Sequence, residues 1–147
     1  DGTRLVYRLS GTARGVETAA SQLGGDRDSQ ASTFWEELRE QRLAFFAGDM
    51  PLWRLSVPAA TPPLSLDGEQ LVDWGGAQRW LRSTAPADDI RRAAAGAGGH
   101  ATLFRGGERS GAVFHPLEPA VLALHQRLKT AFDPGGVLNP GRMYADV

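Results

Sequence analysis

The chain has 147 residues, of which 41% are hydrophobic and 22% charged, a composition typical of one folded domain of ordinary size. The formal net charge is −1, so the composition gives no sign of a nucleic acid or another polyanion as partner. There are no cysteines, which excludes disulfides, thiolate catalysis and any zinc or iron–sulfur site ligated by cysteines of this chain. No apolar stretch approaches about 20 residues, so no membrane span is predicted.

The first third of the chain is predicted to contain one strand and two helices. Polar and apolar residues alternate over residues 3–9, which indicates a strand close to the chain start. Thr12 is a candidate N-cap for a helix over residues 14–23. A second apolar stripe of helical spacing predicts an inserted helix over residues 32–47, with its aromatic side chains in the core.

The middle of the chain is predicted to supply the main strands of a sheet. Residues 51–58 alternate between two faces, so that Arg54 lies mid-strand among apolar neighbours. Residues 69–74 are a further strand, and residues 77–82 are a strand or a turn, because the glycines before each segment are typical of hairpin turns. These connections are short, so the sheet should be largely antiparallel.

Helices and a last strand complete the predicted fold. We expect a helix over residues 87–97, a strand over 100–105 and a final helix over 118–132 with a buried apolar stripe. Residues 96–99 are glycine-rich but follow a helix, so we interpret them as helix termination and not as a phosphate loop. The predicted class is α+β, a ferredoxin-like antiparallel sheet with helices on one face, an inserted helix, and a C-terminal helix with a docked tail.

The last fifteen residues carry unusual backbone constraints. Two prolines fix φ and remove N–H donors, while three glycines permit positive φ or close packing. Asn139 and Arg142 are therefore held in fixed positions at a chain end, where disorder is the ordinary expectation. We expect this tail to be docked against another group.

Candidate chemistry must come from single polar residues, because the common P-loop, nucleophile-elbow and zinc-protease motifs are missing and no metal-ligand cluster is evident. Arg54 is suited to anchor a carboxylate on the sheet, or else forms a salt bridge or a solvated strand face. Asp73 and Arg79 either pair with each other or line a flat ligand beside Trp74. His115 precedes a proline, so its extended backbone lets it face a substrate or take a structural role.

Three segments resemble a known family. Residues 124–143, L-H-Q-R-L-K-T-A-F-D-P-G-G-V-L-N-P-G-R-M, resemble the C-terminal end of FAD-linked oxidases of the vanillyl-alcohol-oxidase type. Residues 51–58, P-L-W-R-L-S-V-P, and 72–81, V-D-W-G-G-A-Q-R-W-L, are similar to the FAD-binding subunit of bacterial glycolate oxidase. The resemblance spans roughly the region from Pro51 to the end.

The resemblance implies that residues 1–147 are the C-terminal cap domain of a flavoprotein whose N-terminal FAD-binding domain is absent. It implies oxidation of a small 2-hydroxy acid with FAD, which the missing domain mostly holds, and an inactive isolated fragment. The implied partners are a second flavin subunit and an iron–sulfur subunit, and the implied location is cytoplasmic, at the inner membrane only through partner subunits. A non-catalytic, ferredoxin-like module for subunit docking is the alternative.

The resemblance also sharpens the predicted site. The family's tail packs near the flavin, where an amide can bind the ring and a guanidinium can stabilise negative charge. The predicted cofactor-binding residues are Asn139, Arg142, Trp74, Gly75, Gly76 and Arg79. The predicted catalytic residues are Arg54 and His115, and no metal ligand is predicted.

Overall fold

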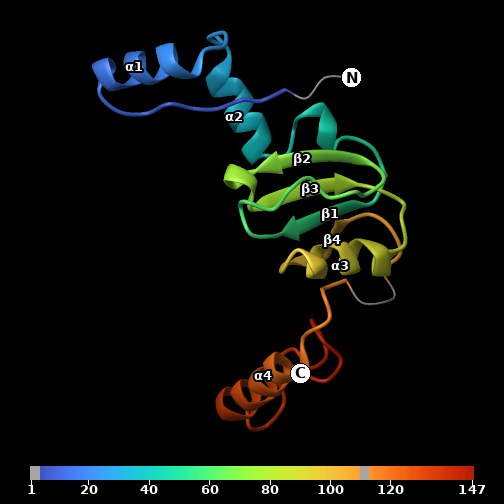
Figure 1. The fold of residues 1–147 in the computed structure, drawn as a ribbon. Helices are drawn as coiled ribbons and strands as arrows, with labels where there is room; N and C mark the ends of the chain where they lie inside the picture. The colour runs from blue at the N-terminus through green and yellow to red at the C-terminus, as the bar shows by residue number, and fades with distance from the viewer. Residues whose placement is uncertain (1–3, 110–112) are drawn as a thin grey trace. The chain divides into compact units, whose positions relative to one another are not determined.

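The computed structural model describes residues 4–109 and 113–147. The chain divides into two compact units, Asp1–Gln41 and Arg42–Val147. Figure 1 shows the elements of both units in chain order.

The first unit holds two helices, α1 (Ala13–Leu23) and α2 (Ala31–Arg39). Thr12 is the predicted N-cap of α1, and its hydroxyl oxygen accepts a hydrogen bond from the Gly15 amide at 3.2 Å. The strand predicted over residues 3–9 is wrong for the described residues 4–9. These residues pair with no other strand, and alternation alone cannot supply a partner.

The inserted helix predicted over residues 32–47 is also corrected. Helix α2 ends at Arg39, and Gln41 follows with a positive φ of 55°, a conformation that cannot continue a right-handed helix. The second unit then begins with a short 3₁₀ turn, η1 (Ala44–Phe46). The apolar stripe was continuous in sequence, but the backbone turns within it.

The second unit contains a four-stranded antiparallel sheet, as predicted. Its strands are β1 (Leu52–Ser56), β2 (Glu69–Asp73), β3 (Gln78–Arg82) and β4 (His100–Arg105). They lie in the order β2-β3-β1-β4, and every neighbouring pair is antiparallel. Figure 1 shows this order. The α+β prediction is therefore confirmed.

One helix, α3 (Ala87–Gly96), joins β3 to β4 and packs on one face of the sheet. The connection from β1 to β2 contains no helix. The core between α3 and the sheet is formed by Trp53, Leu55, Leu81, Ile90, Ala94, Ala101 and Leu103, each at most 4% exposed. We call this side of the sheet the core face.

Helix α4 (Pro119–Phe132) and the tail that follows it are also ordered. The Asp133 carboxylate accepts hydrogen bonds from the amides of Val137 and Leu138, at 3.1 and 2.8 Å, and lies 2.7 Å from the Lys129 ammonium. These contacts, first the hydrogen bond from Lys129, lower the pKa of Asp133 to about 2. The tail therefore has a fixed backbone, as its prolines and glycines predict.

The expectation that the apolar stripe of α4 is buried is wrong for the described chain. Val121, Leu124, Leu128 and Phe132 are 42–83% exposed. The periodicity correctly predicted a helix, but the apolar stripe of that helix is exposed in the described chain.

Candidate functional site

The strand register divides the side chains of the sheet between two faces. Leu55 on β1 lies opposite Arg79 on β3 and Ala101 on β4, on the core face. Its neighbour Arg54 lies opposite Trp80 and Thr102. Directly paired residues project to the same side of an antiparallel sheet, so Arg54 points away from α3. We call this second side the open face.

The η1 segment covers one end of the open face. Phe46 is 4% exposed and packs edge-to-face on Trp80, with ring centroids 5.5 Å apart. The Arg105 guanidinium donates to the Phe46 carbonyl at 2.6 Å. Arg82 at the same end forms an ion pair with Glu69 at 3.1 Å. Both arginines here are engaged with partners of this chain.

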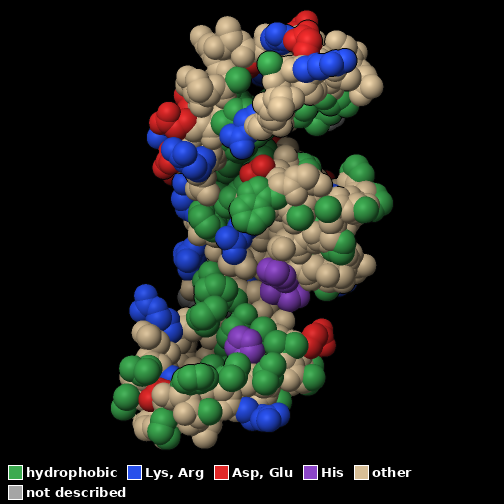
Figure 2. Space-filling model, turned by 90° about the vertical axis from the view of Figure 1, so that its left-hand side faces the viewer, with side chains coloured by type: hydrophobic (Ala, Val, Ile, Leu, Met, Phe, Trp, Pro, Cys, Tyr) green, Lys and Arg blue, Asp and Glu red, His purple; other side chains and the backbone are tan. Residues whose placement is uncertain are grey.

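The other end of the open face carries a group of polar side chains that we call the open polar patch. The pairing of β1 with β3 and β4 places five polar residues on this face: Arg54, Ser56, Gln78, His100 and Thr102. None of these five side chains is acidic, and the carboxylate of Asp73, which lies opposite Gln78 on the same face, is two strands away from Arg54. Figure 2 shows hydrophobic, basic and histidine side chains close together on one side of the part that holds the sheet.

Arg54 is the charged member of the open polar patch. It is exposed, and within residues 4–109 and 113–147 it forms no ion pair and donates no hydrogen bond. Its guanidinium carbon lies 6.0 Å from the ring centroid of Phe104, which packs edge-to-face on Trp80 at 5.0 Å. An internal salt bridge is therefore not formed within the described residues, which leaves the carboxylate anchor and the solvated strand face. The side chain presents an available guanidinium beside an aromatic wall, an arrangement that suits a small anion.

His100 enters the patch because β4 begins beside the end of β1. Gly98 ends α3 with a φ of 76°, and a Cβ on Gly99 would lie 2.1 Å from the Ser56 carbonyl oxygen. This close approach pairs His100 with Ser56. Sequence reasoning missed His100, because alternation gives its face only after the register with β1 is known.

Arg79 does not lie on the same face of the sheet as Arg54. It is 4% exposed on the core face, and its guanidinium donates to the carbonyls of Thr61, Pro62 and Gly76. The predicted pairing with Asp73 is not formed; that carboxylate accepts from the Trp74 amide at 2.7 Å. Arg79 therefore holds the loop between β1 and β2, and its predicted cofactor role does not fit this geometry.

The segment from Trp74 to Gly76 forms a 3₁₀ turn, η2, between β2 and β3. Trp74 is 74% exposed and has a positive φ of 50°, which is unusual for a bulky residue. A Cβ on Gly76 would lie 2.3 Å from the Ala59 carbonyl oxygen, whereas Gly75 has open space around it. The turn thus fixes an exposed indole at the end of a hairpin.

His115 lies along the outer edge of β4. Its Nδ1 accepts a hydrogen bond from the Ala101 amide at 3.3 Å, and the Val113 carbonyl accepts from Leu103 at 3.0 Å. Burial, followed by the charges of His100 and Arg91, lowers the pKa of His115 below 6.5. One ring nitrogen of His115 therefore accepts a hydrogen bond from the edge of β4. The ring centroid of His115 lies 6.5 Å from that of His100.

Asn139 and Arg142 are exposed on the ordered tail. Asn139 has a φ of 47°, and its carbonyl accepts from the Arg142 amide at 3.2 Å. Neither side chain forms a hydrogen bond within the described part of the chain. Both predicted cofactor residues thus present available polar groups at defined backbone positions.

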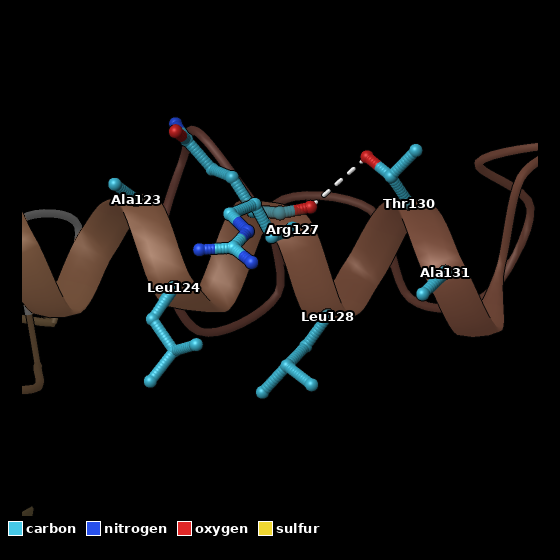
Figure 3. A pocket seen from close by; sticks show the side chains of 7 residues that line it. Ala123, Leu124, Arg127, Leu128, Thr130 and Ala131 are labelled. Atoms are coloured by element: carbon cyan, nitrogen blue, oxygen red, sulfur yellow. Dashed lines mark hydrogen bonds between the residues drawn. The ribbon is translucent and has the colours of Figure 1, made fainter.

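The described ranges hold no cluster of three or more histidine, aspartate, glutamate or cysteine residues suited to a metal ion. No helix in these ranges is long and apolar enough to cross a membrane. An open pocket lies on α4 (Figure 3), but one helix supplies all seven lining residues, so no groups from different elements converge there.

The chain is similar in sequence to a known protein. It is 49% identical, over 143 residues, to glycolate oxidase subunit GlcE of Escherichia coli K12. The chain is related to the C-terminal part of that subunit. The match covers 97% of this chain and 39% of GlcE, and the predicted resemblance to a glycolate oxidase subunit is confirmed. No family model and no solved structure matches the chain.

Proposed function

We propose that this chain is the C-terminal part of a glycolate-oxidase-type flavoprotein subunit, and that its open polar patch binds a small 2-hydroxy acid through the carboxylate. The observation that carries the proposal is Arg54, an exposed arginine without an acidic partner in the described chain. The 49% identity with GlcE supports the class of protein.

The surroundings of Arg54 favour a carboxylate as its ligand. A guanidinium presents paired N–H donors that match two carboxylate oxygens, and such pairs are stronger than neutral hydrogen bonds. The ring of Phe104 lies on one side of the guanidinium, with its centroid 6.0 Å from the guanidinium carbon. The remaining members of the patch are uncharged or histidine, so none of them repels an anion.

FAD is the proposed cofactor, and it would supply the hydride acceptor when bound. Asn139 and Arg142 would hold its ring system, one by an amide hydrogen bond and one by stabilising negative charge. Their exposed side chains on an ordered tail fit this role. Trp74 would offer a flat surface to the same cofactor, since its indole is exposed on a rigid turn. Most contacts with FAD would lie outside these 147 residues.

The test uses the full-length subunit that contains this chain, purified with flavin. We expect glycolate to bleach the flavin absorbance of the wild type, and Arg54→Ala to slow that bleaching at least 10-fold, about the loss of one charge-assisted hydrogen bond. Arg92→Ala is the matched control, because Arg92 is also exposed but lies on α3. Equal bleaching of the wild type and Arg54→Ala would reject the substrate assignment.

The flavin contacts are tested separately in the same subunit. Asn139→Ala and Arg142→Ala should lower the flavin content or shift the redox potential of the bound flavin. If both variants keep the wild-type flavin content and potential, the tail does not contact the cofactor.

A subunit-docking module is the second candidate, and exposed apolar side chains favour it. Leu124, Phe132, Val137 and Met143 are 50–83% exposed on α4 and the tail, where Figure 2 shows hydrophobic side chains. A second flavin subunit and an iron–sulfur subunit are the proposed partners. Phe132→Ser should then abolish co-purification of the complex and leave the response of the isolated subunit to glycolate unchanged. Loss of that response instead would favour a direct role of α4 in the flavin site.

A further inference from the structure

We propose that His100 is the second recognition group of the open polar patch. In this arrangement Arg54 binds the substrate carboxylate, and a ring nitrogen of His100 accepts a hydrogen bond from the hydroxyl on the adjacent carbon. The inference rests on the proposed function, and it explains how the patch distinguishes a hydroxy acid from a simple carboxylic acid.

The strand register sets the separation of the two groups. Arg54 lies opposite Thr102, and His100 is two residues before Thr102 on the same strand, so Arg54 and His100 are diagonal neighbours. Such neighbours have Cα atoms about 7–8 Å apart, and their side chains project to the same face of an antiparallel sheet. A small hydroxy acid above Ser56 and Thr102 would therefore have both side chains beside it.

The His100 ring is available for this contact. It is exposed, and its nitrogens form no hydrogen bond in the described ranges. Its histidine neighbour, His115, already accepts from the Ala101 amide and is directed to the strand edge. His100 is therefore the histidine that the register places on the same face as Arg54.

The backbone before His100 keeps the ring in place. Gly99 packs so closely on the Ser56 carbonyl that no Cβ fits between them. This contact fixes the start of β4 against the end of β1, and thereby fixes the position of His100 relative to Arg54. A recognition group gains specificity when its supporting backbone is rigid.

The test compares glycolate with acetate, which lacks the hydroxyl. Both are titrated into this chain at the same fixed pH, and binding is followed by NMR. We expect the wild type to bind glycolate about 3- to 10-fold more tightly than acetate, the effect of one hydrogen bond. His100→Ala and His100→Phe should bind both acids with the affinity that the wild type has for acetate.

The controls separate this inference from the proposed function. Arg54→Ala should bind neither acid, and His125→Ala, which changes a histidine on α4, should behave like the wild type. Equal affinities for the two acids, or a preference that survives both His100 variants, would overturn the role of His100 alone. Absence of Arg54-dependent binding would overturn the proposed function, and the role of His100 with it.

Discussion

The two faces of the sheet differ in what their side chains contact. On the core face, Leu55 is 1% exposed under α3, and the buried Arg79 is held by three carbonyls. On the open face, Arg54 is exposed and has no ion-pair partner in the described chain. Arg54 and Leu55 are adjacent in sequence, so one strand supplies both the core and the candidate site. Arg82 and Arg105 also lie on the open face but have partners in this chain, so both the face and the neighbours of an arginine decide whether its guanidinium is available.

The largest effect should come from the core face. Leu55→Ala removes a side chain packed in the central cluster, and such truncations cost about 2–5 kcal/mol of unfolding free energy. Urea unfolding, followed by circular dichroism, measures the change. A loss below about 1 kcal/mol would mean that the cluster under α3 is not the core, and would contradict the difference described between the two faces of the sheet.

The next effect concerns the buried arginine. Arg79→Met leaves the carbonyls of Thr61, Pro62 and Gly76 without their donor, so we expect a loss of about 1–3 kcal/mol. The control is Arg92→Ala, which breaks an exposed ion pair with Asp89 and should cost at most about 1 kcal/mol. If Arg79→Met instead keeps the wild-type stability, the arginine does not hold the loop and is open to another role.

The smallest effect is a dependence of stability on pH at the strand edge. Because burial and nearby charges lower the pKa of His115, its contribution to stability is fully present above about pH 6.5 and is lost as the pH falls below 6.5 through the lower pKa of the folded protein. The wild type should therefore lose more stability between about pH 8 and pH 5.5 than His115→Asn, which cannot titrate. Parallel losses in the two proteins would show that burial and nearby charges do not lower the pKa of His115.

Much of the sheet could be predicted from the sequence, because local patterns determine it. Alternation over residues 51–58 correctly separated Arg54 from Leu55, and glycines marked the turns on either side of β2. The strand predicted over residues 3–9 was wrong, because a strand also needs a neighbour. The single helix predicted over residues 32–47 was wrong, because the spacing of apolar residues does not reveal that Gln41 has a positive φ.

The candidate site was less predictable than the fold. Arg54 and Arg79 look alike in sequence, and only the register and the packing of the loop before β2 assign them to opposite faces. His100 was missed because its neighbours on the open face come from another strand. Asn139 and Arg142 were found through the constraints of the tail, and their contact with flavin remains a proposal.

The central claim is that Arg54 contributes to ligand binding and not to stability. Its most direct test is the unfolding free energy of the wild type and of Arg54→Ala, each with and without glycolate. Without ligand the two proteins should agree within about 0.5 kcal/mol, as for other exposed substitutions. Glycolate at about 100 times its Kd should stabilise the wild type by about 2.7 kcal/mol and leave Arg54→Ala unchanged. Equal stabilisation of both proteins, or a variant that is strongly destabilised without ligand, would contradict the account.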